Sequence, residues 1–444
     1  MSLLAYQQMK PSGIEYVGDI PNDWSSKRLG DLVSFAQGKA HEPYIDDDGD
    51  YICVNSRFVS TSGQTIKTCS VNLTPASLND ILMVMSDLPN GRALARAYYV
   101  GDHGKYAVNQ RVCRITAERA HPRFLFYLLD RHPGLMQNDD GVHQTHLSNA
   151  DFQKLKLCLP SASEQSQIAR FLDHETARID ALIEEQQRLI ALLKEKRQAV
   201  ISHVVTKGLD PTVPMKDSGV EWLGEVPAHW VVSKFGYISS VVRGGSPRPA
   251  GDPELFNGDY SPWVTVAEIT KDDEIYLDET ETFLTKKGSD QCRVFSKGTL
   301  LLSNSGATLG VPKILMIDAN ANDGVVGFEN ISLDKEYSYL YLATLTEGLR
   351  DRAAGSGQPN LNTDIVKSID VPIPPSNEVT EIVAAVKKLR AQFNFLSKEA
   401  VEGIKLLQER RSALISAAVT GKIDVRGWQP QSSAPIPELA QEAV

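Results

Sequence analysis

One short phrase occurs twice in this chain. SGIEYVGDIPNDW at 12–24 returns as SGVEWLGEVPAHW at 218–230, with six identical positions and five exchanges of like for like. The copies lie 206 residues apart, far beyond the roughly 20 to 50 residues of a solenoid repeat. The duplicated unit is therefore the size of a domain. Two glycines and a proline in each copy predict an irregular segment, which we expect Trp24 and Trp230 to pin in place.

A second repeat closes each half of the chain. KEKRQAVISHVVTKGLD at 194–210 returns as QERRSALISAAVTGKID at 408–424, now 214 residues later. The two halves therefore share both ends, whereas the sequences between those ends diverge almost completely. We interpret this as a repeated frame that carries two different inserts.

The repeated frame is helical by pattern. Steps of four and three residues, starting at Ile168 and again at Ile382, meet apolar side chains at most positions. This spacing is typical of the heptad seam of a coiled coil. The side chains expected to pack between the two helices are Ile168, Leu172, Ile179, Leu182, Leu189, Leu193, Val200, Ile382, Val386, Leu389, Phe393, Leu396, Leu407 and Leu414.

Residues that start and stop helices flank both seams. Ser161 with Glu164 fits a capping box at the first start, and Ser376 can cap the second helix. Gly208 and Gly421 stand where the helices should end.

The first predicted helix is too long to be buried by one compact domain. At 1.5 Å per residue, residues 163–206 form a rod of roughly 66 Å. The matching partner is the other copy, and because the first helix leads away from its own insert into the second, the simplest pairing is antiparallel, with the inserts at opposite ends. The alternative is two ordinary long helices, each packed on its own domain.

The inserts, 25–160 and 231–374, read as short strands broken by Gly, Pro, Asn and Asp. The predicted fold class is therefore mixed α/β (α+β), with two recognition domains, two long antiparallel coiled-coil helices and an internal pseudo-two-fold repeat. The expected domains are 1–160 (first repeat segment and first insert), 161–210 (central helix), 211–375 (second repeat segment and second insert), 376–423 (distal helix) and 424–444 (a tail rich in Pro, Ser and Gln, expected to be disordered).

Composition sets the broad class. The chain is 42% hydrophobic and 23% charged, has a formal net charge of −10, and contains no apolar run of the roughly 18 residues that a membrane span requires. No secretory signal is visible, and five cysteines without a C-x-x-C pair indicate reduced thiols. We therefore expect a cytoplasmic protein with no membrane partner. We read the pair HQTH at 143–146 as solvated or core histidines, so no metal site is predicted.

Several loops of the inserts are rich in glycine and in hydrogen-bond donors, which suit phosphates and base edges. The same composition also describes any solvated loop, and residues 231–352 hold twelve Lys and Arg against eighteen Asp and Glu. The candidate DNA-binding residues are Arg92, Arg96, Lys105, Asn109, Gln110, Arg111, Arg243, Arg248, Gln358 and Asn360.

The motifs of common enzymes are missing from the sequence. There is no phosphate-binding G-x-x-x-x-G-K-[ST], no H-E-x-x-H and no G-x-S-x-G. The Asn/Asp-Pro-Pro-aromatic motif of amino-group methyltransferases is also absent. We therefore predict a binding protein without catalytic residues.

At this point the segments resemble a known family, the specificity subunit of type I restriction-modification systems. The resemblance rests on SGVEWLGEVPAHW, on residues 244–269, on FSKGTLLLSNSGATLG at 295–310 and on GSGQPNLNTDIVKSIDVPIPPSNE before the second helix. It covers nearly the whole chain and is closer in the second half. Where the family commonly has an Asn-Gln pair, the first half has Asn109 and Gln110 but the second has Asn322 and Asp323.

The resemblance implies a non-catalytic subunit in which each insert is a target recognition domain for one half of a bipartite site in double-stranded DNA. Two copies of an adenine methyltransferase (M) subunit would dock on the helices, and restriction/translocase (R) subunits would join them. The chain itself would hold no cofactor, because S-adenosylmethionine, ATP and Mg belong to those partners.

The helices would then act as a spacer, since B-DNA rises about 3.4 Å per base pair. Two other hypotheses stay open: a coiled-coil scaffold or adaptor with no role at DNA, and the recognition subunit of a methyltransferase-nuclease fusion system.

Overall fold

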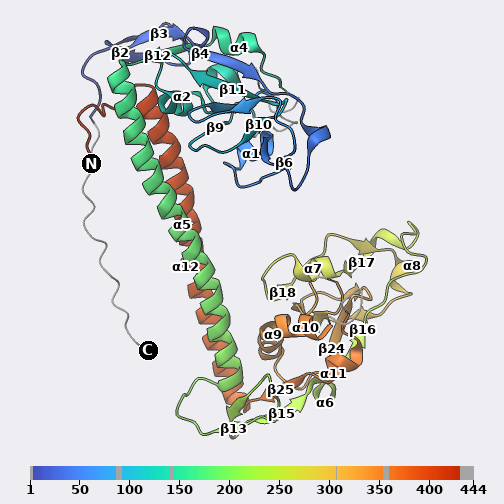
Figure 1. The fold of residues 1–444 in the computed structure, drawn as a ribbon. Helices are drawn as coiled ribbons and strands as arrows, with labels where there is room; N and C mark the ends of the chain where they lie inside the picture. The colour runs from blue at the N-terminus through green and yellow to red at the C-terminus, as the bar shows by residue number, and fades with distance from the viewer. Residues whose placement is uncertain are drawn as a thin grey trace. The chain divides into compact units, whose positions relative to one another are not determined.

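The chain forms two compact units in the computed structural model. The first comprises Met1–Gln186 with Glu402–Val444, and the second comprises Gln187–Val401. Each unit therefore contains one insert and a stretch of each long helix (Figure 1). The residues described are 4–86, 93–137, 139, 145–306, 308–353 and 360–430.

The first unit is built on two four-stranded sheets, in the orders β4-β11-β8-β9 and β6-β5-β10-β7. The strand β8 reads ILMV and is buried at all four positions, as expected for a central strand whose two faces are both covered. The elements of this unit are β1 (Met9–Pro11), β2 (Asp19–Pro21), β3 (Ser25–Arg28), η1 (Leu29–Asp31), β4 (Val33–Gln37), η2 (Glu42–Tyr44), β5 (Tyr51–Val54), α1 (Ser56–Ser60), β6 (Thr68–Cys69), β7 (Pro75–Ala76), β8 (Ile81–Val84), β9 (Ala97–Tyr99), β10 (Tyr106–Val108), β11 (Val112–Ala117), α2 (Pro122–Leu129), α3 (Pro133–Met136), α4 (Asn149–Lys154) and β12 (Lys156–Leu159).

The second unit has a five-stranded sheet, β16-β24-β21-β22-β18, and a four-stranded sheet, β19-β17-β23-β20. Its central strand β21 reads LLLS and is again buried at all four positions. The elements are β13 (Met215–Asp217), β14 (Glu225–Pro227), β15 (Val231–Lys234), α6 (Phe235–Ile238), β16 (Ser240–Arg243), β17 (Phe256–Val264), α7 (Val266–Thr270), β18 (Tyr276–Leu277), β19 (Phe283–Leu284), α8 (Lys286–Ser289), β20 (Val294–Phe295), β21 (Leu300–Ser303), β22 (Pro312–Leu315), β23 (Ala319–Ala321), β24 (Val325–Glu329), α9 (Lys335–Thr344), α10 (Thr346–Ala353), α11 (Thr363–Lys367) and β25 (Asp370–Ile373).

The two inserts share one topology although their sequences diverge. The antiparallel pairs β11·β4 and β11·β8 correspond to β24·β16 and β24·β21, and the parallel pair β10·β5 corresponds to β23·β17. In each insert a helix follows the central antiparallel strand, α2 after β11 and α9 after β24. The predicted mixed fold with an internal repeat is therefore confirmed, and the repeat extends through the inserts as well as the frame.

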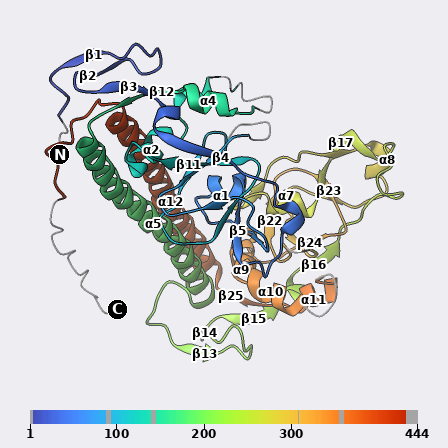
Figure 2. The same ribbon diagram turned by 45° about the horizontal axis from the view of Figure 1, so that its top comes forward.

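The repeated phrase grips the beginning of one long helix and the end of the other. In the first unit the buried Trp24 donates its indole N–H to Glu164 Oε1, 3.2 Å away, in the first turn of the helix α5 (Ala162–Lys207). Gly421, just past the helix α12 (Ser376–Val419), adopts φ +71°, and a Cβ there would lie 2.4 Å from Pro21. The strand β2 lies within this phrase, and β3 follows it directly (Figure 2).

The second unit repeats the same grip with the helices exchanged. The indole of the buried Trp230 donates to Glu378 Oε2 at 2.9 Å, now in the first turn of α12. Gly208 follows the end of α5 at φ +78°, and a Cβ there would lie 3.3 Å from the Trp230 ring. Both glycines predicted to end helices thus occupy the left-handed conformation that a helix C-cap requires.

Within each unit the stretches of α5 and α12 run antiparallel. Arg411 donates to Asp180 at 2.8 Å in the first unit, and Arg197 donates to Asn394 at 3.0 Å in the second. In the first unit Trp24 brings the start of α5, at Glu164, to the end of α12, at Gly421, and in the second unit Trp230 brings the start of α12, at Glu378, to the end of α5, at Gly208. The predicted antiparallel helix pair is confirmed in each unit.

The side chains predicted to pack between the helices differ in burial along the helices. Ile168, Leu172, Ile179, Ile382 and Val386 are buried, while Leu193, Val200, Leu389, Phe393, Leu407 and Leu414 are half-buried. By contrast, the large side chains that remain exposed are Leu182 (39%), Leu189 (42%) and Leu396 (48%).

The burial pattern is shifted by one residue at these positions. Ile183, Ile190 and Ser397 are half-buried where Leu182, Leu189 and Leu396 are exposed. The buried and half-buried positions after Ile179 are therefore spaced by four and then three residues, whereas the predicted seam continues by three and then four. Both spacings repeat every seven residues.

The burial pattern predicts that truncating Leu182 and truncating the adjacent Ile183 lower the stability of the chain by different amounts. Ile183→Ala should lower the free energy of unfolding by about 1 to 2 kcal/mol, because a half-buried side chain is removed from the helix contact. Leu182→Ala should cost less than about 1 kcal/mol. Urea unfolding followed by circular dichroism measures both; an equal or larger loss for Leu182→Ala would restore the original seam.

Candidate nucleic-acid interface

In the first unit a cluster of polar residues forms where β10 leads into β11. Asn109 is buried; its amide donates to Glu42 Oε1 at 3.0 Å, and its oxygen accepts from the backbone N–H groups of His41 and Gln110 at 3.3 and 2.7 Å. The hydrogen bond from Asn109 is the main cause that lowers the pKa of Glu42. Asn109 therefore shapes the loop, while Gln110 and Arg111 next to it are exposed.

Close backbone packing holds the same loop. A Cβ on Gly38, just past β4, would lie 2.1 Å from the Asn109 carbonyl oxygen. No side chain fits there, so the end of β4 and the loop before β11 are pressed together. The exposed Gln110 and Arg111 are thus displayed from a fixed backbone.

Two other predicted residues of this unit have partners of their own. Arg96 donates to Asp130 at 3.3 Å, at the end of α2, and is partly exposed. Lys105 is mostly exposed, with Asp50 at 3.7 Å. Because exposed ion pairs contribute little stability, Lys105 can exchange its carboxylate for a phosphate, whereas Arg96 is tied to the structure of the domain.

The second unit builds an equivalent cluster where β23 leads into β24. Arg243 Nε donates to the Asp323 carbonyl at 2.7 Å, and Ser246 donates to Asp323 Oδ1 at 2.7 Å. The bond from Ser246 is the main cause that lowers the pKa of Asp323, with Arg243 and Arg248 contributing. A Cβ on Gly244, just past β16, would lie 2.3 Å from the Asn322 carbonyl oxygen, as Gly38 does to Asn109.

Two more of the predicted residues lie in the described part of the second unit. Arg248 is exposed, and its backbone N–H donates to Gln291 at 2.9 Å. Asn360 is exposed and forms an isolated bridge with Ser305. Arg92 and Gln358 lie outside the described residues.

Sequence reasoning missed Glu42, and it singled out Asp323 only as a departure from the family's Asn-Gln pair. A lone acidic residue in a polar loop carries no pattern, and its role emerges when the fold brings it to the donors of Asn109 or Ser246. The glycines Gly38 and Gly244 gave a weak signal, since each follows a strand directly.

The chemistry of the two clusters suits base edges. Arginine and glutamine donate to guanine and adenine, and a carboxylate accepts from the amino group of cytosine, whereas it repels phosphate. A loop that displays exposed donors beside a fixed carboxylate can therefore discriminate between bases and not only attract the backbone.

The described residues hold no helix long and apolar enough to cross a membrane. Within the same part of the chain, no three His, Cys, Asp or Glu side chains come together as a metal site would need.

A family model described as the type I restriction modification DNA specificity domain matches residues 21–192 and again 227–405. These two matches cover most of the chain and divide it as the structural repeat does. The chain belongs to this family. The resemblance drawn from the repeated segments is therefore confirmed, and with it the prediction of a DNA-recognising specificity subunit.

Specificity subunits of other type I restriction enzymes align with this chain. The MjaVIII specificity subunit of Methanocaldococcus jannaschii is 21% identical over 92% of this chain and 94% of that protein. The EcoDI specificity subunit of Escherichia coli is 20% identical over 94% and 92%. The MjaIX specificity subunit of M. jannaschii is 31% identical, over 41% of this chain and 44% of that protein. These matches do not favour the scaffold or the fusion-system hypothesis.

Solved structures share the fold of the specificity protein. The HsdS subunit from Thermoanaerobacter tengcongensis superposes with a TM-score of 0.52 at 17% identity, covering 91% of this chain and 98% of that one. A chain from a structure on the assembly and conformational transition of the type I R-M system gives 0.64 at 18%, covering 91% and 99%.

The close packing at Gly244 predicts an unequal effect of alanine at two adjacent glycines. Gly244→Ala should destabilise the second unit by about 1 to 3 kcal/mol, because its Cβ meets the backbone at 2.3 Å. Gly245→Ala is the matched control, since its Cβ would meet nothing within 4 Å. Thermal unfolding measures both, and equal midpoints for the two variants would contradict the strand-to-loop packing.

Proposed function

We propose that the specificity protein reads a bipartite site in double-stranded DNA, with one insert on each half. The observation that carries this proposal is the duplicated loop cluster: two inserts of one topology hold polar loops at equivalent places, with Asn109 bonded to Glu42 in the first and Ser246 bonded to Asp323 in the second, but with different exposed side chains. Equal frames with unequal reading residues suit a site whose two halves differ in sequence. Gln110, Arg111, Arg243 and Arg248 are the residues that we assign to DNA contact.

The chain would contribute recognition and no chemistry. Methyltransferase subunits that hold S-adenosylmethionine would dock on the repeated frame, and because the frame occurs twice, it offers two equivalent surfaces to two identical copies. Restriction subunits that use ATP and Mg would join that core.

The long helices would set the number of unread base pairs between the half-sites. α5 has 46 residues and is therefore about 69 Å long at 1.5 Å per residue. A helix pair of fixed register resists compression, so its length translates into a fixed spacing along DNA.

The direct test is to map methylated adenines in DNA exposed to the specificity protein with its methyltransferase subunits. We expect one asymmetric site with two defined parts and a constant gap. A continuous site, or methylation that ignores sequence, would refute the proposal.

Arginine truncations should weaken one half-site at a time. Arg248→Ala should lower affinity by about 1 to 3 kcal/mol for sites that match in the second-domain half, if the side chain reads a base. Arg111→Ala should do the same for the first-domain half. Competition binding with oligonucleotides altered in either half measures this; a uniform loss over all sequences would demote either residue to a phosphate contact.

A matched deletion in both helices should shorten the gap and leave both half-sites unchanged. Residues 183–189 and 402–408 lie, along α5 and α12, between the bonded pairs Asp180–Arg411 and Arg197–Asn394, so removing both heptads leaves each pair able to form. Removing both shortens the pair by about 10 Å, or about three base pairs.

Methylation mapped on a library with random gaps reads out the result of the deletion. Deleting 183–189 alone is the control, because it breaks the register and should reduce activity at every gap. Altered half-site sequences in the matched deletion would contradict the spacer role.

A further inference from the structure

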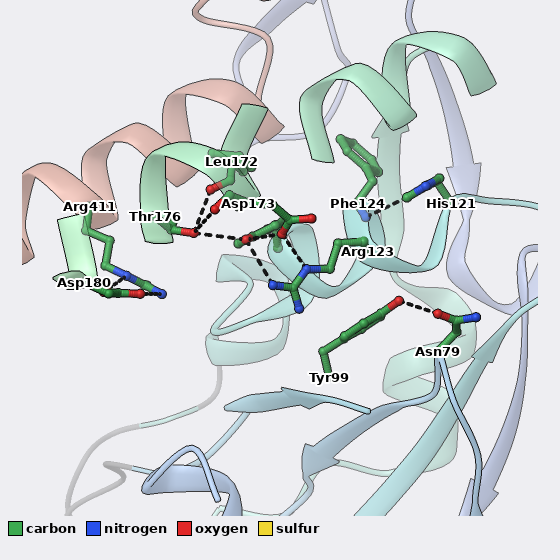
Figure 3. A network of polar contacts seen from close by, with 11 residues as sticks. Asn79, Tyr99, His121, Arg123, Phe124, Leu172, Asp173, Thr176, Asp180 and Arg411 are labelled. Carbon is green, nitrogen blue, oxygen red and sulfur yellow. Dashed lines mark hydrogen bonds and ion pairs between the residues drawn. The ribbon is translucent and has the colours of Figure 1, made fainter. Parts of the chain in front are cut away.

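An ion pair joins the first insert to its long helix. Arg123 on α2 donates from Nε to Asp173 Oδ1 on α5 at 2.6 Å (Figure 3). Aromatic rings surround the guanidinium: its carbon lies 4.6 Å from the centre of Tyr99, 4.9 Å from Phe126 and 5.1 Å from Tyr127. The Tyr127 hydroxyl also donates to Asp173, at 2.7 Å. This cation is therefore partly desolvated and held by both charge and ring faces.

An ion pair of opposite polarity joins the second insert to its long helix. Lys387 on α12 donates to Glu336 Oε2 on α9 at 2.6 Å, and the Tyr276 hydroxyl donates to the other oxygen of Glu336. In the first unit the cation belongs to the insert and the anion to the helix. In the second unit the anion belongs to the insert and the cation to the helix.

The two ion pairs occupy the same structural positions. Arg123 is the second residue of α2, which follows β11, and Glu336 is the second residue of α9, which follows β24. The N-caps of these helices are His121 and Asp334. Asp173 is the twelfth residue of α5, and Lys387 is the twelfth residue of α12. The repeat thus aligns insert with insert and helix with helix, and only the signs of the charges differ.

The next turn of each long helix follows the same rule. Thr176 on α5 lies 3.2 Å from the Tyr127 hydroxyl, so this position offers the first insert a neutral hydrogen bond. Its equivalent on α12 is Arg390, which donates to the Asp273 carbonyl of the second insert at 2.8 Å. α12 therefore presents two cations to its insert, where α5 presents a carboxylate and a hydroxyl.

Helix stability does not explain the sign of Arg123. A cation near a helix N-terminus opposes the macrodipole, whereas a carboxylate there is favourable. Glu336 agrees with this preference and Arg123 goes against it. Since Arg123 has Asp173 as its partner, the contact with α5 accounts for its charge.

We propose that these two ion pairs are charge-reversed docking keys, which position each recognition domain on its own helix and reject the other domain. With the domains exchanged, Arg123 would face Lys387 and Glu336 would face Asp173, like charges at hydrogen-bond distance. Without this difference in charge, the repeated frame would offer each insert two similar contact positions, one on α5 and one on α12. The positioning part rests on the proposed function, because the key sets where the reading loops lie relative to the helices.

Charge reversal in the intact chain tests the keys. Asp173→Lys gives Arg123 the charge that it would meet on the other helix, and Lys387→Asp does the same for Glu336. We expect each variant to unfold at a lower temperature. In complex with methyltransferase subunits, each should bind DNA about tenfold more weakly, which corresponds to about 1.4 kcal/mol. Only the half-site of the altered unit should matter to the loss.

Restoring opposite charges should rescue both properties. Arg123→Glu with Asp173→Lys should recover part of the unfolding midpoint and of the affinity lost in Asp173→Lys, because the ion pair returns while the ring contacts of the guanidinium do not. Glu336→Lys with Lys387→Asp should likewise recover the losses of Lys387→Asp. The controls reverse a charge on the same helices away from the inserts: Arg178→Glu, beside Glu175 on α5, and Lys405→Glu, beside Glu402 on α12. Both controls should behave as the native chain does.

The outcomes separate the keys from the proposed function. Single reversals that match the controls, or double reversals that fail to recover thermal stability, would overturn the keys. If the double reversals recover thermal stability but the single reversals never weaken binding to either half-site, the positioning role is overturned. Rescue in thermal unfolding by a complex that reads no bipartite site would support the keys and refute the proposed function.

Discussion

The rest of the architecture depends on an indole N–H donated to a carboxylate in the first turn of a long helix. Trp24 makes this bond to Glu164 and Trp230 makes it to Glu378, and both indoles are almost wholly buried. The bond is charge-assisted, and the negative charge of the glutamate is favourable at the helix N-terminus. Because the same tryptophan packs near the end of the other helix, at Gly421 or Gly208, one short phrase fixes the start of one helix and the stop of the other.

That arrangement explains why the chain contains the phrase twice. A single copy would hold α5 at its start and α12 at its end, and it would leave the other two termini unheld. The second copy supplies the missing grip with the helices exchanged, which makes the antiparallel order the one that satisfies both phrases. Within each compact unit, the repeated phrase and the repeated helix end therefore form one contact. The two repeats differ in spacing by eight residues, and the extra residues lie in the second insert.

The sequence alone predicts the helices well because a heptad pattern persists over many turns. It fails at Leu182 and Leu189 because each is followed by an isoleucine, so either phase of the heptad gives an apolar residue there. In the structure Ile183 and Ile190 are the more buried of each pair. At Leu396 the apolar pattern misleads outright, since the residue turned inward is Ser397. The common topology of the inserts could not be predicted at all, because strand pairing is made by backbone groups that any sequence carries.

The candidate site was predictable in composition and not in detail. Exposed donors such as Arg111 and Arg248 lie in the loops where the sequence places them, but Asn109 turns inward and Arg96 is bound to Asp130. Which donor is free depends on which carboxylate the fold brings beside it, and carboxylates outnumber cations in this chain. Pairing leaves the net charge of −10 unchanged, so binding to DNA depends on which groups lie at the reading loops and not on the total.

Several acidic groups form ion pairs within the protein. Asp173, Glu336 and Asp180 hold helices and inserts together through Arg123, Lys387 and Arg411. A carboxylate in such a pair contributes little field at a distance, because its partner's charge cancels it within a few ångströms. The surface that DNA meets is set by the groups left over at the loops, so a protein can be acidic in sum and still present donors where it reads.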